Sequence, residues 1–179
     1  KGSVEAVYAT GMYGLINVAI RDLVRDKFGE AQWSEIVTKS GVTDDDFARM
    51  EPCDDAKTYA LVGAASEVLG MPASEILQAF GEYWTVFTAD EGYGPMMDAA
   101  GSTLPEFLMN LDHLHTRVGM MYPELKPPAF RCSEVSDKSL MLHYQSERDG
   151  LDDLVIGLLR GLGTRFKIDV SIEQKQSKS

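Results

Sequence analysis

The sequence predicts an α+β fold, in which an N-terminal helical subdomain is followed by a C-terminal subdomain with a small antiparallel sheet and packed helices. Three observations support this prediction. Apolar residues recur at spacings of three and four through residues 13–119, which is typical of amphipathic helices. Residues 130–146 instead hold two strand-like runs around a polar turn, and the helical spacing returns over residues 151–166. The chain has 179 residues, which suits a single domain.

The first half of the chain is expected to be helical, because each apolar-periodic run ends at a residue that stops helices. The predicted helices cover residues 13–27, 31–40, 57–69 and 72–87. Between the second and third, Thr43 and three aspartates are read as a loop or an acidic helix start. Glycines at residues 92 and 94 are expected to end the fourth helix, and the break over residues 92–95 is a candidate boundary between subdomains.

The second half mixes both kinds of element. A helix is predicted over residues 104–119, and Pro127–Pro128 then forces an extended path. Strands over residues 130–135 and 140–146 form an antiparallel hairpin, because residues 136–139 have turn composition. A helix over residues 151–166 and a final strand through Ile168, Val170 and Ile172 complete the predicted elements.

Composition limits the classes of partner and location. The chain has 28 acidic and 17 basic residues and a net charge of -11, which disfavours nucleic acid and anionic membrane surfaces. No apolar run approaches the roughly 18–20 residues that span a bilayer, and no signal-peptide pattern is visible, so we expect a cytoplasmic location. Cys53 and Cys132 are too few for a disulfide framework, and we expect both to be reduced.

A polar motif follows the second strand of the hairpin. Side chains at alternate positions of an extended segment share one face, so Tyr144, Ser146 and Arg148 are expected to point together. Two hydroxyls and a guanidinium suit a ligand with carboxylates or phosphates, because arginine can bind one anionic group through two hydrogen bonds. A porphyrin with two propionates fits this description.

One histidine is expected to face the core. His115 shares an apolar helical stripe with Leu111 and Val118, whereas His113 points away from that stripe. A neutral imidazole in such a position is a good axial ligand for haem iron, and it leaves the opposite position open for a diatomic gas.

With these motifs the chain resembles the haem nitric oxide/oxygen binding (H-NOX) domains, a family that includes the haem domain of the soluble guanylate cyclase β subunit. The resemblance covers residues 12–170 and its motifs occur in family order. The matching stretches are Met12-Tyr13-Gly14, Leu111-Asp112-x-Leu114-His115, Pro127-Pro128-Ala129-Phe130-Arg131-Cys132 and Tyr144-x-Ser146-x-Arg148.

The resemblance implies a haem b group held between the two subdomains, with His115 on the iron and the Tyr144 motif on the propionates. It further implies that Trp84 lines the distal side. The other expected pocket residues are Met12, Ile16, Leu111, Pro128 and Leu154. It also implies one sensor domain over residues 12–174, preceded by a leader over residues 1–11 that is an expression remnant and followed by a frayed tail over 175–179.

Family members that hold oxygen use a distal tyrosine, and we align Leu154 with that position. Because an aliphatic side chain cannot donate a hydrogen bond to polar bound oxygen, the resemblance implies selection for nitric oxide, with carbon monoxide as a second ligand. Nitric oxide would weaken the His115 bond, and the released helix would signal to an effector: a guanylate cyclase, a histidine kinase or a diguanylate cyclase.

Two alternatives stay open at this stage. A haem-free helical interaction module would use His115 as an ordinary core histidine. A haem enzyme would need distal acid–base groups, yet His113 and His143 both face away from the expected site.

Overall fold

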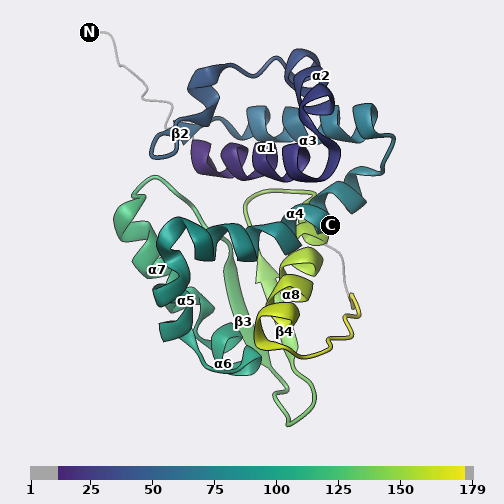
Figure 1. The fold of residues 1–179 in the computed structure, drawn as a ribbon. Helices are drawn as coiled ribbons and strands as arrows, with labels where there is room; N and C mark the ends of the chain where they lie inside the picture. Colours follow the sequence, from purple (N-terminus) through teal and green to yellow (C-terminus); the bar gives the residue numbers. More distant parts are fainter. Residues whose placement is uncertain (1–11, 176–179) are drawn as a thin grey trace, which may run out of the picture.

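A computed structural model describes residues 12–175, with Met12 described by its backbone alone (Figure 1). The α-helices are α1 Gly14–Phe28, α2 Glu30–Ser40, α3 Asp55–Leu69, α4 Ala73–Thr88, α5 Gly94–Ala100, α6 Leu104–Met109, α7 Leu111–Met121 and α8 Asp152–Phe166. A 3-10 helix η1 covers Asp44–Phe47 and a π-helical turn η2 covers Ala89–Tyr93. The strands are β1 Met12–Tyr13, β2 Pro52–Cys53, β3 Ala129–Ser133 and β4 Met141–Gln145.

Two groups of elements form the predicted α+β arrangement. Figure 1 shows α1, α2 and α3 stacked together, with α5, α6, α7, α8 and the β3–β4 hairpin in the other group and α4 between them. Apolar side chains of α4, among them Leu77 and Phe80, pack with the α1–α3 core, while the α4 backbone packs against α8. The second core lies under the hairpin and includes Phe107, Phe130 and Leu162.

The break expected at residues 92–95 is a kink within a helical segment. The chain there continues from α4 through η2 into α5, and only Gly92, at φ 102°, departs from helical geometry. Glycine adopts this positive φ without strain, so it kinks the helical segment rather than ending it. The two groups of elements meet across α4 instead.

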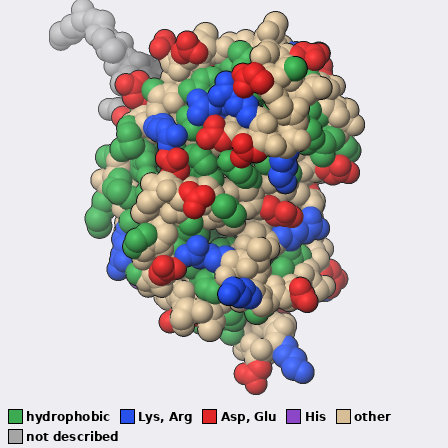
Figure 2. Space-filling view, viewed as in Figure 1, with side chains coloured by type: hydrophobic (Ala, Val, Ile, Leu, Met, Phe, Trp, Pro, Cys, Tyr) green, Lys and Arg blue, Asp and Glu red, His purple; other side chains and the backbone are tan. Residues whose placement is uncertain are grey.

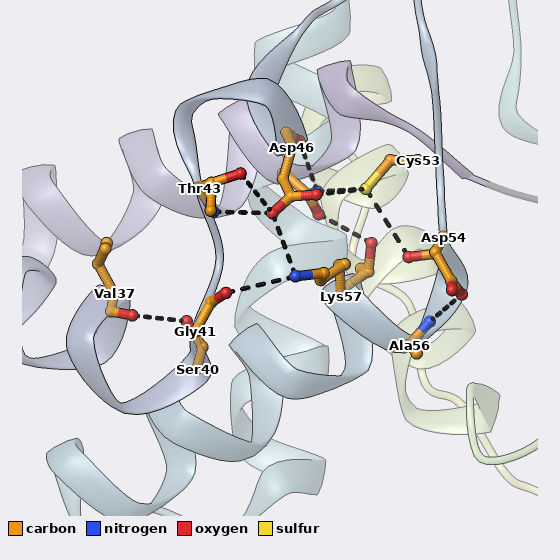
Figure 3. A network of polar contacts seen from close by, with 11 residues as sticks. Val37, Ser40, Gly41, Thr43, Asp46, Cys53, Asp54, Ala56 and Lys57 are labelled. Carbon is orange, nitrogen blue, oxygen red and sulfur yellow. Dashed lines mark hydrogen bonds and ion pairs between the residues drawn. The ribbon is translucent and has the colours of Figure 1, made fainter.

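The acidic stretch after α2 forms the short helix η1, which resolves the choice between loop and helix start. Thr43 and Asp46 form a capping box, in which the Thr43 amide donates to Asp46 Oδ2 at 2.8 Å. Lys57 reaches both Gly41 O (3.3 Å) and Asp46 Oδ2 (3.6 Å), and Figure 3 shows these contacts converging between η1 and α3.

A buried amide completes the same network. Asn17 of α1 is fully buried and donates from Nδ2 to Asp46 O at 2.8 Å and to Cys53 Sγ at 3.2 Å. Its Oδ1 accepts from Thr58 Oγ1 at 2.8 Å. Because buried polar groups are costly unless paired, this network fixes α1, η1 and α3 relative to one another.

Most predicted elements are confirmed within about two residues, with two exceptions. The helix expected over 104–119 is split into α6 and α7 at Asn110, whose side chain donates to Ala100 O at 2.8 Å. The final strand expected through Ile168, Val170 and Ile172 is not formed. Lys167 turns the chain in a left-handed conformation, and Val170 lies against Gly163 of α8 rather than beside a strand.

The hairpin is antiparallel as predicted, with Phe130 opposite Tyr144. Its turn is closed by the Ser136 amide, which donates to Ser139 O at 2.8 Å. The structure adds the two-residue pairing of β1 with β2, which the sequence analysis missed because so short a pair leaves no alternation to detect.

Helices α4 and α8 touch through their backbones. A Cβ on Gly157 of α8 would overlap the Gln78 carbonyl, and a Cβ on Gly81 of α4 would overlap the Leu154 carbonyl. The absence of side chains at both positions therefore sets the distance between these helices.

Both cysteines are free thiols as expected, Cys53 buried and Cys132 half-buried. Burial raises the pKa of each thiol above its ordinary value. Both are therefore held in the unreactive thiol form near neutral pH.

Charged side chains of both signs are interspersed on the face that Figure 2 shows. Across residues 12–175, no single helix is long and apolar enough to cross a bilayer, although the bent pair Asp55–Leu69 and Ala73–Ala100, at 114°, passes by length and composition.

The leader expected over residues 1–11 and most of the tail expected over 175–179 lie outside the described residues, as does the side chain of Met12.

Candidate functional site

A central cavity of about 290 Å³ lies between the two groups of elements. Its wall is mainly apolar and takes side chains from α1, α3, α4, α7, α8 and the hairpin. The expected pocket residues Ile16, Trp84, Leu111, Pro128 and Leu154 all line it. A largely apolar cavity with a few convergent polar groups is the usual form of a cofactor site.

The expected metal ligand lies at this wall. His115 is half-buried on α7, and its Nδ1 is 3.2 Å from the Pro128 carbonyl oxygen. Burial lowers the pKa of His115, while the Pro128 carbonyl and the charge of Asp112 oppose that shift. The neutral imidazole therefore donates from Nδ1, which leaves the lone pair on Nε2 for a metal.

Contacts between α7 and residues 128–130 fix the orientation of this histidine. Asp112, one turn before His115, accepts a hydrogen bond from the Phe130 amide through Oδ1 at 2.8 Å. The Phe130 ring lies 5.8 Å from the imidazole. Two polar contacts thus tie α7 to residues 128–130, and the proline corner predicted from the sequence supplies the carbonyl that orients the ring.

The polar motif lines the cavity too, although its backbone is not extended as the sequence predicted. Tyr144, Ser146 and Arg148 all contribute to the wall. Strand β4 ends at Gln145, and Ser146 Oγ accepts from the Arg148 amide at 3.0 Å, so the motif turns instead of staying extended. Tyr144 packs against the Phe130 ring at 5.5 Å.

Arg148 also joins the two halves of the molecule. Its Nε donates to Asp55 Oδ2 of α3 at 2.9 Å, and its Nη1 donates to the Lys126 carbonyl at 2.8 Å. Only 11% of the Arg148 side chain is exposed. The sequence analysis missed Asp55 and Lys126, and no local pattern could have found them because they lie 93 and 22 residues from Arg148.

The wall formed by α4 and α8 is poor in donors. Trp84 stacks on Phe87 with ring centroids 5.7 Å apart, and Leu154 presents an aliphatic side chain. The nearby hydroxyls of Thr85 and Thr88 donate to backbone carbonyls of their own helix, Glu82 O at 2.9 Å and Trp84 O at 2.7 Å. Both hydroxyl protons are therefore already used in hydrogen bonds within α4.

Four tyrosines that were not expected at the site, Tyr13, Tyr59, Tyr93 and Tyr122, also line the cavity. The hydroxyls of Tyr93 and Tyr122 contact each other, and the rings of Tyr13 and Tyr122 meet edge to face at 4.6 Å. Burial raises the pKa of Tyr122, so its phenol stays protonated. Only the position of Tyr13 within the first matched motif could have indicated a role.

Comparison with known proteins identifies related sequences and structures. The sequence model of the family described as Haem-NO-binding matches residues 13–174. Soluble guanylate cyclase gcy-31 of Caenorhabditis elegans is 36% identical over 163 residues, which is 90% of this chain and 23% of that protein. The soluble guanylate cyclase subunit beta-2 of Rattus norvegicus is 40% identical over 91 residues, 51% of this chain and 13% of that protein. The chain thus spans about a quarter of the gcy-31 length.

Solved structures share the fold. An H-NOX protein from S. oneidensis in the Fe(II)NO ligation state superposes with a TM-score of 0.83 at 22% identity, covering 93% of this chain and 91% of that one. The unliganded Fe(II) H-NOX protein from K. algicida gives a TM-score of 0.76 at 24% identity, covering 87% of this chain and 84% of that one.

Proposed function

The chain belongs to the haem-NO-binding (H-NOX) family of haem-based gas sensors, and from that premise we propose that it binds haem b in the central cavity through His115 and selects nitric oxide over oxygen. The observation that carries the proposal is His115 at the cavity wall, neutral and oriented by the Pro128 carbonyl. Metal-binding histidines commonly use one ring nitrogen in this way and ligate through the other.

The donor set suits the acid groups of a porphyrin. Arg148 carries five N–H donors and stands at the cavity wall beside two hydroxyls, Tyr144 and Ser146. A propionate at this end would join Asp55 on the guanidinium. The residues present therefore fit haem, and a bound haem would supply an iron atom for His115 to hold and a binding place for a diatomic gas.

Replacing Arg148 with alanine is expected to weaken haem retention. A charge-assisted hydrogen bond to a propionate is worth about 1–3 kcal/mol, so haem transfer to an acceptor apoprotein should become roughly 5–150 times faster. The matched control is Asp55→Asn, which removes the ion pair between α3 and Arg148 but keeps the guanidinium. If Arg148 binds a propionate, the control should keep most of its haem. Equal losses in both variants would mean that Arg148 acts only by pairing with Asp55.

Gas selection would follow from the α8 wall. Leu154 offers no hydrogen-bond donor, and oxygen gains less from an apolar pocket than nitric oxide does. Trp84 carries the one indole N–H among the cavity residues, and its ring packs face to face on Phe87. We infer that the indole N–H of Trp84 does not donate a hydrogen bond to bound gas.

Introducing a donor at this wall should change the preference. We expect haem-loaded Leu154→Tyr to retain oxygen in air, seen in the absorption spectrum, whereas the parent chain and Leu154→Phe do not. The phenylalanine control fills the same space without a hydroxyl. Oxygen retention by the parent chain, or by both variants alike, would refute donor-based selection.

We further propose a signalling role, with a guanylate cyclase as the favoured effector because both relatives reported above are soluble guanylate cyclases. If His115 lost its tether to a bound haem, α7 would be able to shift relative to the cavity while Asp112 kept its hydrogen bond to the Phe130 amide. GTP turnover by a cyclase that carries this domain should respond to nitric oxide and lose the response in His115→Gly. An unchanged response in that variant would exclude this route.

Neither of the two histidines other than His115 supports the alternative that the chain is a haem enzyme. Of the three histidines in the chain, His113 is exposed and His143 bonds Ser133 Oγ at 2.7 Å on the hairpin, and neither lines the central cavity. Acid–base catalysis by histidine at bound gas is therefore unsupported by the geometry.

A further inference from the structure

A second positively charged side chain lies at the polar end of the central cavity. Among the described residues that line the cavity, Lys126 and Arg148 are the two with a lysine or arginine side chain, and none is an aspartate or a glutamate. Arg148 Nη1 donates to the Lys126 carbonyl at 2.8 Å, so the two residues are neighbours at this end. The sequence pattern indicated Arg148 but not Lys126, because Lys126 lies outside the alternating motif.

The positive charge of Arg148 is already shared with a carboxylate of the chain. Its Nε donates to Asp55 Oδ2 at 2.9 Å, and only 11% of the Arg148 side chain is exposed. A ligand with two carboxylates would bring two further negative charges to the same end of the cavity. Like charges at close range repel, so Arg148 alone leaves an excess of negative charge that a second cation would reduce.

The ammonium of Lys126 is free to change its partner at low cost. Its Nζ lies 3.4 Å from Glu147 Oε2, and 51% of the Lys126 side chain and 74% of the Glu147 side chain are exposed. An ion pair as exposed as this contributes little to stability. The Lys126 backbone, in contrast, is held by Arg148 and followed by two prolines, so the flexible stem can turn from Glu147 toward the cavity while its base stays in place.

We propose that Lys126 is a further propionate-binding residue, whose ammonium leaves Glu147 and pairs with one propionate of a bound haem. The chain would then meet the two acid groups of the porphyrin with two cations, Arg148 and Lys126. Glu147 competes with the propionate for Lys126. This inference rests on the proposed function, since it requires haem in the central cavity.

The test uses the haem-loaded chain, with haem that carries ¹³C in both propionate carboxyl groups. In the diamagnetic carbon monoxide complex, ¹³C NMR gives the pKa of each carboxyl. Because a nearby ammonium favours the ionised form, Lys126→Gln should raise the pKa of one propionate and leave that of the other nearly unchanged. Transfer of haem to an acceptor apoprotein should become roughly two- to fivefold faster, as expected for the loss of an exposed ion pair.

Three matched variants accompany this measurement. Lys126→Arg keeps the positive charge and should restore both the propionate pKa values and the transfer rate of the parent. Lys138→Gln removes a lysine charge from the hairpin turn, away from the cavity wall, and should also behave like the parent. Glu147→Gln removes the competing carboxylate and should release haem no faster than the parent does.

Unchanged propionate pKa values in Lys126→Gln would overturn the inference. Equally fast release of haem from Lys126→Gln and Glu147→Gln would overturn it too, because the ion pair between these two residues would then be what matters. A parent chain that binds no haem would instead refute the proposed function, whereas a parent that binds haem and is matched by Lys126→Gln in both measurements would refute only the role of Lys126.

Discussion

Replacing His115 with glycine is expected to yield a chain that holds haem only when imidazole is supplied. The variant removes the one imidazole among the residues that line the cavity, while the apolar pocket and the polar end around Arg148 remain. Free imidazole fits the space left by the side chain and restores the axial ligand. The readout is the haem absorbance of purified protein, prepared with and without imidazole.

The matched control is His113→Gly. It lies two residues away on α7 with its side chain exposed, and it costs the same helix about 1 kcal/mol through glycine's flexibility. We expect it to retain haem like the parent. Normal haem retention in His115→Gly without imidazole would remove His115 from the ligand role, and equal loss in both variants would indicate damage to α7 instead.

The second large effect is expected at the contact between α4 and α8. Gly157→Leu places a side chain against the Gln78 backbone, where even a Cβ has no room, so the helices must separate. Overpacking of a core typically lowers the free energy of unfolding by about 1–3 kcal/mol. Because Gly157→Leu would displace backbone, we expect its loss to lie at or above the upper end of that range. For a chain of this size about 3 kcal/mol corresponds to a fall in Tm of roughly 6–12 °C.

Gly63→Ala is the control for this prediction. Gly63 lies within α3, and an added Cβ there meets no atom within 4 Å. Alanine should therefore raise stability by up to about 1 kcal/mol, since it restricts the unfolded chain without a clash. Thermal unfolding followed by circular dichroism measures both variants, and a Tm for Gly157→Leu equal to that of the parent would contradict the close helix contact.

The extent to which the sequence predicted the fold follows from the range of each interaction. Helices such as α1, α3 and α8 were predictable because apolar periodicity is local and survives packing. The break at Asn110 was not, because it depends on a side-chain bond to Ala100 ten residues away. The alternating apolar residues at 168–172 wrongly predicted a strand, because alternation alone supplies no neighbouring strand to pair with.

The same distinction applies to the site. His115 and the Tyr144 motif could be found because a core-facing histidine and an alternating polar set are visible in short stretches. Asp55 and Tyr122 could not. Asp55 bonds Arg148 from α3 and Tyr122 lines the cavity, and both positions depend on the whole fold. The premise that residues 144–148 are extended was wrong, yet the three side chains meet the same cavity because the chain turns after Gln145.

We expect one haem to lie in the cavity between the two groups of elements, with His115 on its iron. A crystal structure of the haem-loaded chain tests it most directly. We expect Nε2 of His115 at about 2 Å from iron, Nδ1 still on the Pro128 carbonyl, and the propionates at Tyr144, Ser146 and Arg148. Haem bound elsewhere, or iron held by another side chain while His115 packs among aliphatic residues, would contradict it.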